Sequence, residues 1–229
     1  VHASNDTYAM RIGESTSGAT TTINAAGGDI TLSSTAKSGA SVRRAIQLIN
    51  ADLSTTGSGE IDVTGDATES GITSSNAWGI EIYGSQLETN SGDITLTGTG
   101  GQDSRDSRGI VAQNTDLKLL SDSGAITLID TDATDGGSDG NRNYKGLWLA
   151  PDSDCSIVLG ADGSDVSTAT GDITLRADTL QANDHTVSAV SSGNLVVESV
   201  GTDFLGETSS INIDATGDNF TSITLGKSG

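Results

Sequence analysis

The pentapeptide Gly-Asp-Ile-Thr-Leu decides the fold of this chain. It occurs three times without change, at Gly28–Leu32, Gly92–Leu96 and Gly171–Leu175. Two variants lie between these copies, Gly-Glu-Ile-Asp-Val at Gly59–Val63 and Gly-Ala-Ile-Thr-Leu at Gly124–Leu128. The central isoleucines are 31, 33, 32 and 47 residues apart. This spacing indicates a repeat of slightly more than thirty residues with one long insertion.

Two other apolar segments recur in phase with the pentapeptide. One starts with a small residue and then alternates apolar and variable residues; it occurs at Ala9–Ile12, Ala45–Leu48, Gly79–Ile82, Gly109–Ala112 and Gly146–Leu149. The other is an aliphatic anchor between the first two, at Ile23, Leu53, Leu87, Leu117 and Ile157. A period of two excludes an amphipathic helix and predicts a strand with one buried face. The repeat therefore predicts three short strands.

Such short strands bury a core only when equivalent strands of successive repeats stack in parallel, about 4.8 Å apart. We therefore predict an all-β fold, a parallel β-helix (β-solenoid) with three strands per coil. Residues 1–229 are predicted to form a single segment of a longer protein, with regular repeats over about 8–176 and less regular coils over 177–229. The closely spaced anchors Leu195, Ile211 and Ile223 indicate either smaller coils or different sides of one coil, and we favour the second interpretation.

The composition fits this arrangement. The chain holds 30 Gly, 31 Ser and 30 Thr among 229 residues, with 33% hydrophobic and 3% aromatic residues, which suits tight corners around a thin core. It carries 31 acidic and 11 basic residues, a net charge of −20. This charge repels phosphate backbones, and no stretch approaches the roughly 18 apolar residues of a spanning helix. We therefore expect no nucleic-acid partner and no membrane insertion.

The repeated phrases resemble a known family. Gly171–Leu180 (GDITLRADTL) followed by Ser191–Ser199 (SSGNLVVES) is similar to the repeat regions of filamentous-haemagglutinin-like large bacterial exoproteins, of the two-partner secretion or autotransporter type. The resemblance covers about residues 20–229. It implies a right-handed parallel β-helix, secreted or at the cell surface, that forms the rod of an adhesin. It also implies a partner on a host or neighbouring cell, either a protein or a glycan.

Three function classes follow from these observations. The first is a non-enzymatic adhesive rod segment, the second a self-assembling subunit of an extracellular filament or surface layer with end-to-end contacts, and the third a polysaccharide-binding or polysaccharide-degrading β-helix. Asn114-Thr115-Asp116 resembles a polygalacturonase phrase, but the Asp-Asp, Gly-His-Gly and Arg-x-Lys groups of that chemistry are missing from the sequence. We therefore expect no catalytic residues, and we interpret His2 and His185 as surface residues.

The acidic residues suggest cation binding at two places. Asp130, Asp132, Asp135 and Asp139 lie in one loop, and carboxylate oxygens on a flexible loop suit Ca²⁺ as a possible cofactor, although the spacing is not that of an EF-hand. The alternative is a solvated insertion. Four acidic residues also share one position of the repeat, namely Asp29, Glu60, Asp93 and Asp172. They are interpreted as caps of backbone N–H groups, with cation binding as the alternative.

A last set of residues combines cations and aromatic rings. Tyr8, Arg44, Trp78, Arg108 and Lys145 share the position before the small residue of the second segment. Such a column predicts a cation–π ladder, and it could also serve as a contact strip for a sugar or a protein. Trp148 is predicted to point outward nearby, either exposed as a carbohydrate platform or covered by the preceding loop. The candidate ligand-binding residues are therefore Trp78, Trp148, Arg44 and Arg108.

Overall fold

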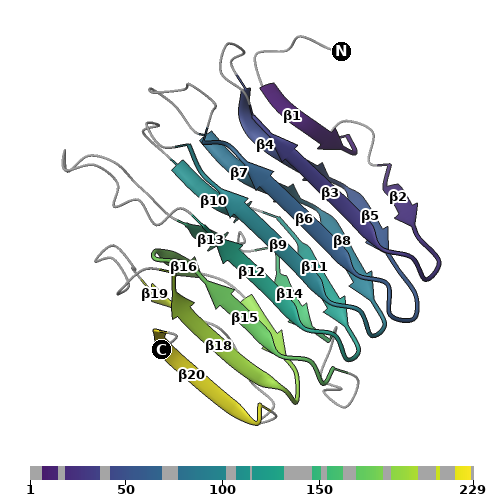
Figure 1. Cartoon of the computed structure of the whole chain (residues 1–229), viewed down its shortest axis with the longest axis vertical. Helices are drawn as coiled ribbons and strands as arrows, with labels where there is room; N and C mark the ends of the chain where they lie inside the picture. The colour runs from purple at the N-terminus through teal and green to yellow at the C-terminus, as the bar shows by residue number, and fades with distance from the viewer. Residues whose placement is uncertain are drawn as a thin grey trace.

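The computed structural model of this chain is an all-β protein. It describes residues 7–14, 19–36, 42–68, 77–101, 107–113, 115–131, 146–150, 154–161, 169–182, 187–200, 210–211 and 220–227. Within these ranges it contains twenty strands and no helix. The strands stack in parallel from β1 at one end to β20 at the other (Figure 1). The predicted β-solenoid is thus confirmed.

Three parallel sheets form the sides of the solenoid. Sheet A contains β1 (Thr7–Ile12), β4 (Val42–Ile49), β7 (Ala77–Tyr83), β10 (Ser107–Gln113), β13 (Leu147–Ala150), β16 (Leu180–Ala182) and β19 (Ser210–Ile211). Sheet B contains β2 (Thr21–Asn24), β5 (Ala51–Ser54), β8 (Ser85–Thr89), β11 (Leu117–Ser121), β14 (Ile157–Gly160) and β17 (Val187–Val190). Sheet C contains β3 (Ile30–Thr35), β6 (Ile61–Asp66), β9 (Ile94–Thr99), β12 (Ile126–Asp130), β15 (Ile173–Arg176), β18 (Asn194–Ser199) and β20 (Ser222–Lys227). Each coil contributes one strand to each sheet, as the three segments of the repeat predict, except that the described residues of the last coil, β19 and β20, add no strand to sheet B.

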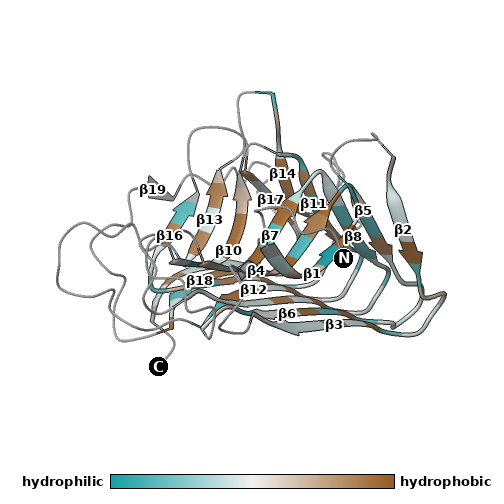
Figure 2. Ribbon diagram, turned by 90° about the horizontal axis from the view of Figure 1, so that it is seen from above, coloured by the Kyte–Doolittle hydropathy of each residue, from teal (hydrophilic) through white to brown (hydrophobic). Residues whose placement is uncertain are grey.

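The core is a set of aliphatic ladders. In sheet C the pentapeptide isoleucines align through the parallel pairing and are at most 6% exposed; they are Ile30, Ile61, Ile94, Ile126 and Ile173. The residue that follows each isoleucine, Asp62 after Ile61 and threonine in the other four coils, points the opposite way, so the strand is apolar inside and polar outside. In the view from above, sheet C lies along the bottom and sheets A and B rise above it (Figure 2).

The anchors of sheet B are aligned differently from the prediction. Leu53 pairs with Leu87, as expected, but Leu87 pairs with Leu119 and not with Leu117. Leu117 pairs with Ser85 instead. A shift of two residues keeps the same face inward, and both leucines of β11 are buried and apolar, so the sequence pattern alone leaves this register open.

The C-terminal coils combine both interpretations of the sequence. Ile173 pairs with Leu195 in sheet C, only 22 residues later, and β16 and β17 lie between them, so this coil is a smaller one. Ile211 belongs to sheet A, whereas Ile223 belongs to sheet C, so these two anchors are different sides of the same coil. The preference for the second interpretation alone was therefore wrong for Leu195.

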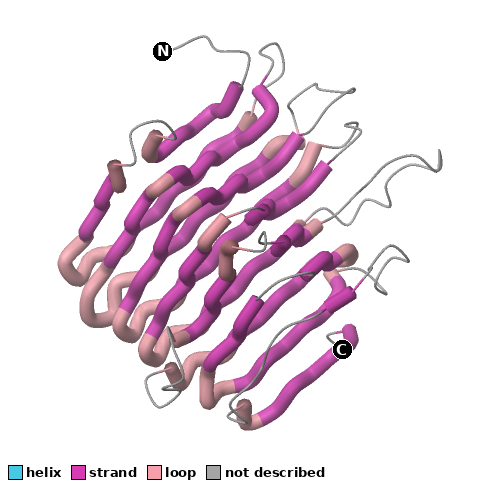
Figure 3. Tube along the Cα trace, turned by 180° about the vertical axis from the view of Figure 1, so that it is seen from behind, coloured by secondary structure: helices cyan, strands magenta, loops and turns pink. Residues whose placement is uncertain are grey.

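In successive coils a short loop connects sheet B to sheet C (Figure 3), and a glycine and a hydroxyl group hold this corner. Thr89 Oγ1 donates to the carbonyl oxygen of Gly92 at 2.6 Å, and Gly124 N donates to Ser121 Oγ at 2.9 Å. A Cβ atom added to Gly124 would lie 1.9 Å from the Gly92 carbonyl oxygen, and one on Gly171 would lie 1.9 Å from the Gly124 oxygen. Successive coils therefore touch through backbone here, which is why the pentapeptide begins with glycine.

Candidate functional site

The outer face of sheet A collects the long polar and aromatic side chains of the repeat. An interruption in the strand pairing places them there. Arg44 pairs with Trp78 and Ile46 with Ile80, and the intervening Ala45 and Gly79 are skipped. A Cβ atom on Gly79 would point toward sheet C, 2.7 Å from the Gly65 oxygen, so two successive residues face inward and the residue before them faces outward.

The same local geometry recurs in the next coil. The N–H groups of Gly109 and Ile110 both donate to the carbonyl oxygen of Gly146, at 3.0 Å and 2.9 Å. Two consecutive donors on one acceptor are typical of an extra residue in the strand. The small residue of the repeat therefore turns the preceding side chain, Arg108 in this coil, to the outer face of sheet A.

The arginines and tryptophans on this face form a continuous stack. The Arg44 guanidinium carbon lies 4.8 Å from the centre of the Trp78 ring, and that of Arg108 lies 5.4 Å from the same ring. Arg108 also lies 3.3 Å from the ring centre of Trp148. We call these four residues, Arg44, Trp78, Arg108 and Trp148, the Arg–Trp stack. The predicted cation–π ladder is confirmed for Arg44, Trp78 and Arg108, and it reaches Trp148 in the neighbouring column, whereas the ring of Tyr8 contacts Arg11.

A buried carboxylate lies beside the stack. Glu81 forms an ion pair with Arg44 Nε, and its Oε2 accepts a hydrogen bond of 2.5 Å from Gln47 Nε2. Glu81 is 1% exposed and the Arg44 side chain 14% exposed. Because both charges are shielded from water, removing one partner would leave the other buried without compensation. Glu81 and Gln47 were not predicted from the sequence as members of this cluster.

The contact strip that the sequence suggested is mostly inside the molecule. Trp78 and Arg108 are 3% and 5% exposed, whereas Trp148 is half-buried with Arg108 against its ring. The stack therefore holds neighbouring coils together, and a ligand meets mainly Trp148 and the edge of Arg44. A contact role for the four residues stays a prediction. Lys145 lies outside the described residues.

The acidic column acts as a set of backbone caps. Asp29 Oδ1 accepts the N–H of Glu60 at 3.0 Å, and Asp93 Oδ1 accepts the N–H of Ala125 at 2.7 Å. Asp172 Oδ1 accepts both the backbone and the side-chain N–H of Asn194, at 2.8 Å and 2.9 Å. Each of these three carboxylates thus binds the next coil at the corner, which confirms the capping interpretation for Asp29, Asp93 and Asp172.

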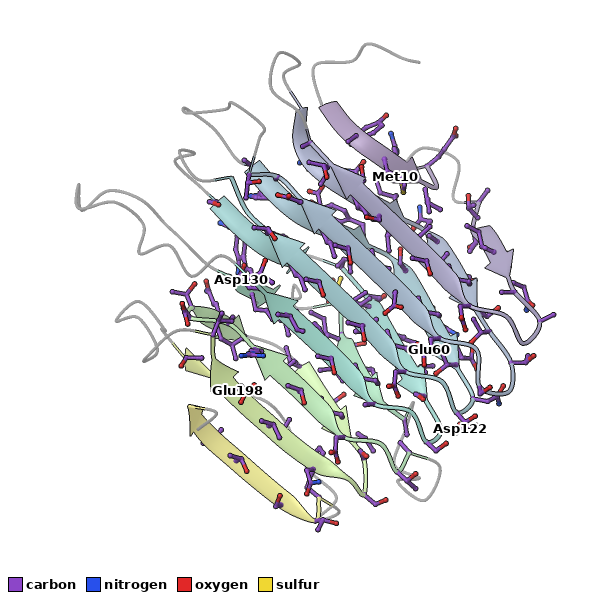
Figure 4. The ribbon with its side chains drawn as sticks, viewed as in Figure 1. Met10, Glu60, Asp122, Asp130 and Glu198 are labelled. Atoms are coloured by element: carbon purple, nitrogen blue, oxygen red, sulfur yellow. The ribbon has the colours of Figure 1, made fainter. Side chains whose placement is uncertain are left out.

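The candidate calcium residues are only partly visible. Asp130 ends β12 at the opposite end of the strands from Glu60 and Asp122 (Figure 4). Its carboxylate is turned inward and is 2% exposed. The two carboxylate oxygens occupy the space that a Cβ atom on Gly109 or Gly146 would need. Asp132, Asp135 and Asp139 lie outside the described residues. No cluster of three metal-ligating side chains occurs in the described part of the chain. Calcium binding stays a prediction.

The enzyme-like phrase of the sequence forms a corner. Asp116 is exposed, and its Oδ1 accepts the N–H of Ser156 at 2.8 Å, while Thr115 Oγ1 accepts the N–H of Gly84. Both hydrogen bonds join neighbouring coils, so these two side chains act as acceptors for backbone N–H groups. Asn114, His2 and His185 lie outside the described residues.

The comparisons add no relative to this picture. Searches against protein-family models, curated proteins and solved structures give no significant match for this chain. In the described segments, no helix is long and apolar enough to span a membrane. The function of the chain is therefore inferred from the geometry of the solenoid and of its outer faces.

Proposed function

We propose that this chain is a non-enzymatic, adhesive rod segment of a secreted or surface-bound bacterial protein, which mediates contact between cells or with a cell surface. The observation that carries the proposal is the unbroken parallel ladder of sheet C from β3 to β20. Each coil adds about 4.8 Å to the length of the molecule, so additional repeats make a longer rod. The polar and aromatic groups described above have structural roles. The Arg–Trp stack, the aspartate caps and the hydroxyl groups at the corners all join one coil to the next.

The proposal is tested in the cells that carry this chain. Antibodies raised against the purified chain should label intact cells as strongly as lysed cells. Purified chain added in excess should inhibit cell–cell aggregation, whereas a Gly124→Val chain, in which the corner contact is blocked, should not. Labelling only after lysis, or aggregation that the folded chain leaves unchanged, would contradict the proposal.

A second candidate function is a self-assembling filament subunit. One observation favours it: Ile223 and Leu225 of β20 continue the inward ladders, yet they are 56% and 69% exposed. An open apolar edge of this kind pairs readily with another strand. Sedimentation velocity of the purified chain over a range of concentrations should then show regular polymers that a Leu225→Lys variant abolishes. A single monomeric species at every concentration would exclude this candidate.

A further inference from the structure

The outer face of sheet C carries a regular array of hydroxyl groups. On β6, β9 and β12 and directly after β12, six threonines point outward, and we call them the threonine face: Thr64, Thr95, Thr97, Thr99, Thr127 and Thr131. All six are exposed or half-exposed. β3 extends the array with the exposed residues Thr31, Ser33 and Thr35.

Strand pairing fixes the spacing of this array in two directions. Thr97 pairs with Thr64 on one side and with Ile129 on the other, and Thr95 pairs with Thr127, with no bulge between these strands. Neighbouring strands lie about 4.8 Å apart, and residues i and i+2 of one strand about 6.6 Å apart. Thr99 and Thr131 are joined through their hydroxyl oxygens at 2.5 Å. The hydroxyls therefore recur at fixed spacings in two directions on the sheet, with Asp62, Asp66 and Ile129 at positions between them.

The array is also rigid and simple in its chemistry. Threonine is branched at Cβ, so its χ1 angle is restricted and the hydroxyl and methyl groups keep fixed positions. The described outward positions of β3, β6, β9 and β12 hold no aromatic or cationic side chain. They hold hydroxyl residues together with two carboxylates on β6, Asp62 and Asp66, and Ile129 on β12. Such a face lacks the ring that usually stacks on a sugar. What it offers is a repeated pattern of hydroxyl and methyl groups, with one carboxylate beside Thr95 and another beside Thr99.

A regular array of hydroxyl groups is matched as a whole only by a ligand whose own atoms repeat at the same spacings. The two spacings are close to the repeats between oxygen atoms at the surface of hexagonal ice, and hydroxyl groups both donate to and accept from water. Because the array is already ordered, holding a layer of water in this pattern costs little conformational entropy. We propose that the threonine face binds ice. This activity is separate from adhesion and uses a different surface from the Arg–Trp stack.

Ice affinity can be measured directly on the purified full chain. Polycrystalline ice is grown slowly from the solution, and the fraction of protein taken into the ice is compared with that of an inert soluble protein. We expect enrichment of the unmodified chain. Thr97→Lys, at the centre of the face, and Thr127→Lys, in the next coil, should each reduce the incorporation to the level of the inert protein.

Gln86→Lys provides the matched control. Gln86 is half-exposed on the outer face of sheet B, between Asp52 and Lys118, so the same lysine is added to a different side of the solenoid. This variant should enter ice like the unmodified chain, and far-UV circular dichroism should show the same strand content for all variants.

Three results would overturn the proposal. One is exclusion of the unmodified chain from ice, another is an equal loss of incorporation in Gln86→Lys and Thr97→Lys. The third is exclusion from ice together with retention on an insoluble neutral polysaccharide, which would assign the face to a sugar. None of these results bears on cell-surface location, so this inference and the adhesive function fail independently.

Discussion

On the outer face of sheet A, Trp78, Glu81 and Arg108 are between 1% and 5% exposed, whereas on the outer face of sheet C Thr64 is exposed and Thr95 and Thr97 are half-exposed. Both faces come from the same repeat. On sheet A the strand pairing is interrupted at the small residue, and the long side chains beside it point outward, stack on one another and exclude water. Strands β3 to β12 of sheet C pair without interruption and carry short side chains that cannot cover one another, whereas Arg176 and Glu198 form an ion pair farther along the same sheet. Local backbone geometry thus makes one face cohesive and leaves the other accessible.

The strongest way to break this comparison is to remove the central ring of the stack. Trp78→Ala should lower the free energy of unfolding by about 4 kcal/mol, because a large buried side chain leaves a cavity between two arginines. Thr97→Ala on sheet C should change it by no more than about 0.5 kcal/mol. Urea denaturation followed by circular dichroism measures both. Equal effects in the two variants would show that the faces do not differ in this way.

The ion pair between Arg44 and Glu81 allows a comparison of a buried and an exposed charge by their effects on stability. Glu81→Ala should cost about 3 kcal/mol of unfolding free energy, because Arg44 is left beside the stack without its carboxylate. Glu88→Ala, at an exposed position of β8, should cost about 0.5 kcal/mol or less. The same denaturation experiment applies, and a Glu81→Gln variant should fall between the two. A loss for Glu81→Ala no greater than for Glu88→Ala would contradict a buried pair.

Substitution of a corner glycine tests the backbone contact between coils without changing a side chain on the outer face of sheet A or sheet C. Gly124→Ala should cost about 2 kcal/mol, because the new methyl group meets the Gly92 oxygen and the backbone must shift. Gly28→Ala is the matched control, since the nearest atom to its Cβ would lie at 3.5 Å, an ordinary contact. Its effect should stay within about 0.5 kcal/mol. Thermal unfolding of both variants decides, and a tolerated Gly124→Ala would exclude the close backbone contact.

The smallest expected effect comes from salt. The chain carries a net charge of −20, and raising the ionic strength from about 0.1 M to about 1 M shortens the screening length from about 10 Å to about 3 Å. The chain should gain about 1 kcal/mol or less of stability. The gain should be the same in Glu81→Gln, because buried charges are little affected by salt. Stability that falls with sodium chloride would contradict repulsion between surface carboxylates.

The sequence predicts the fold and the columns because stacked repeats place equivalent residues side by side. The isoleucine ladder, the capping carboxylates and the cation–π column were all predicted from the repeat, since each depends only on residues at equivalent positions. The register of sheet B was not, because Leu117 and Leu119 satisfy the same pattern. Glu81 was also missed, because a polar residue at an outward position is ordinarily solvated and the sequence gives no sign that its neighbours exclude water.

The sequence by itself determined the all-β architecture, the three strands per coil and the glycine at each corner, because hydrophobic period and repeat length are one-dimensional properties. Only the tertiary structure decided which outward columns are buried and which are exposed. That choice depends on the interrupted strand pairing at the small residue of sheet A, beside which the Arg44, Trp78 and Arg108 side chains point outward. It also depends on contacts between residues about thirty positions apart, where a side chain excludes water only once its neighbour in the next coil is in place.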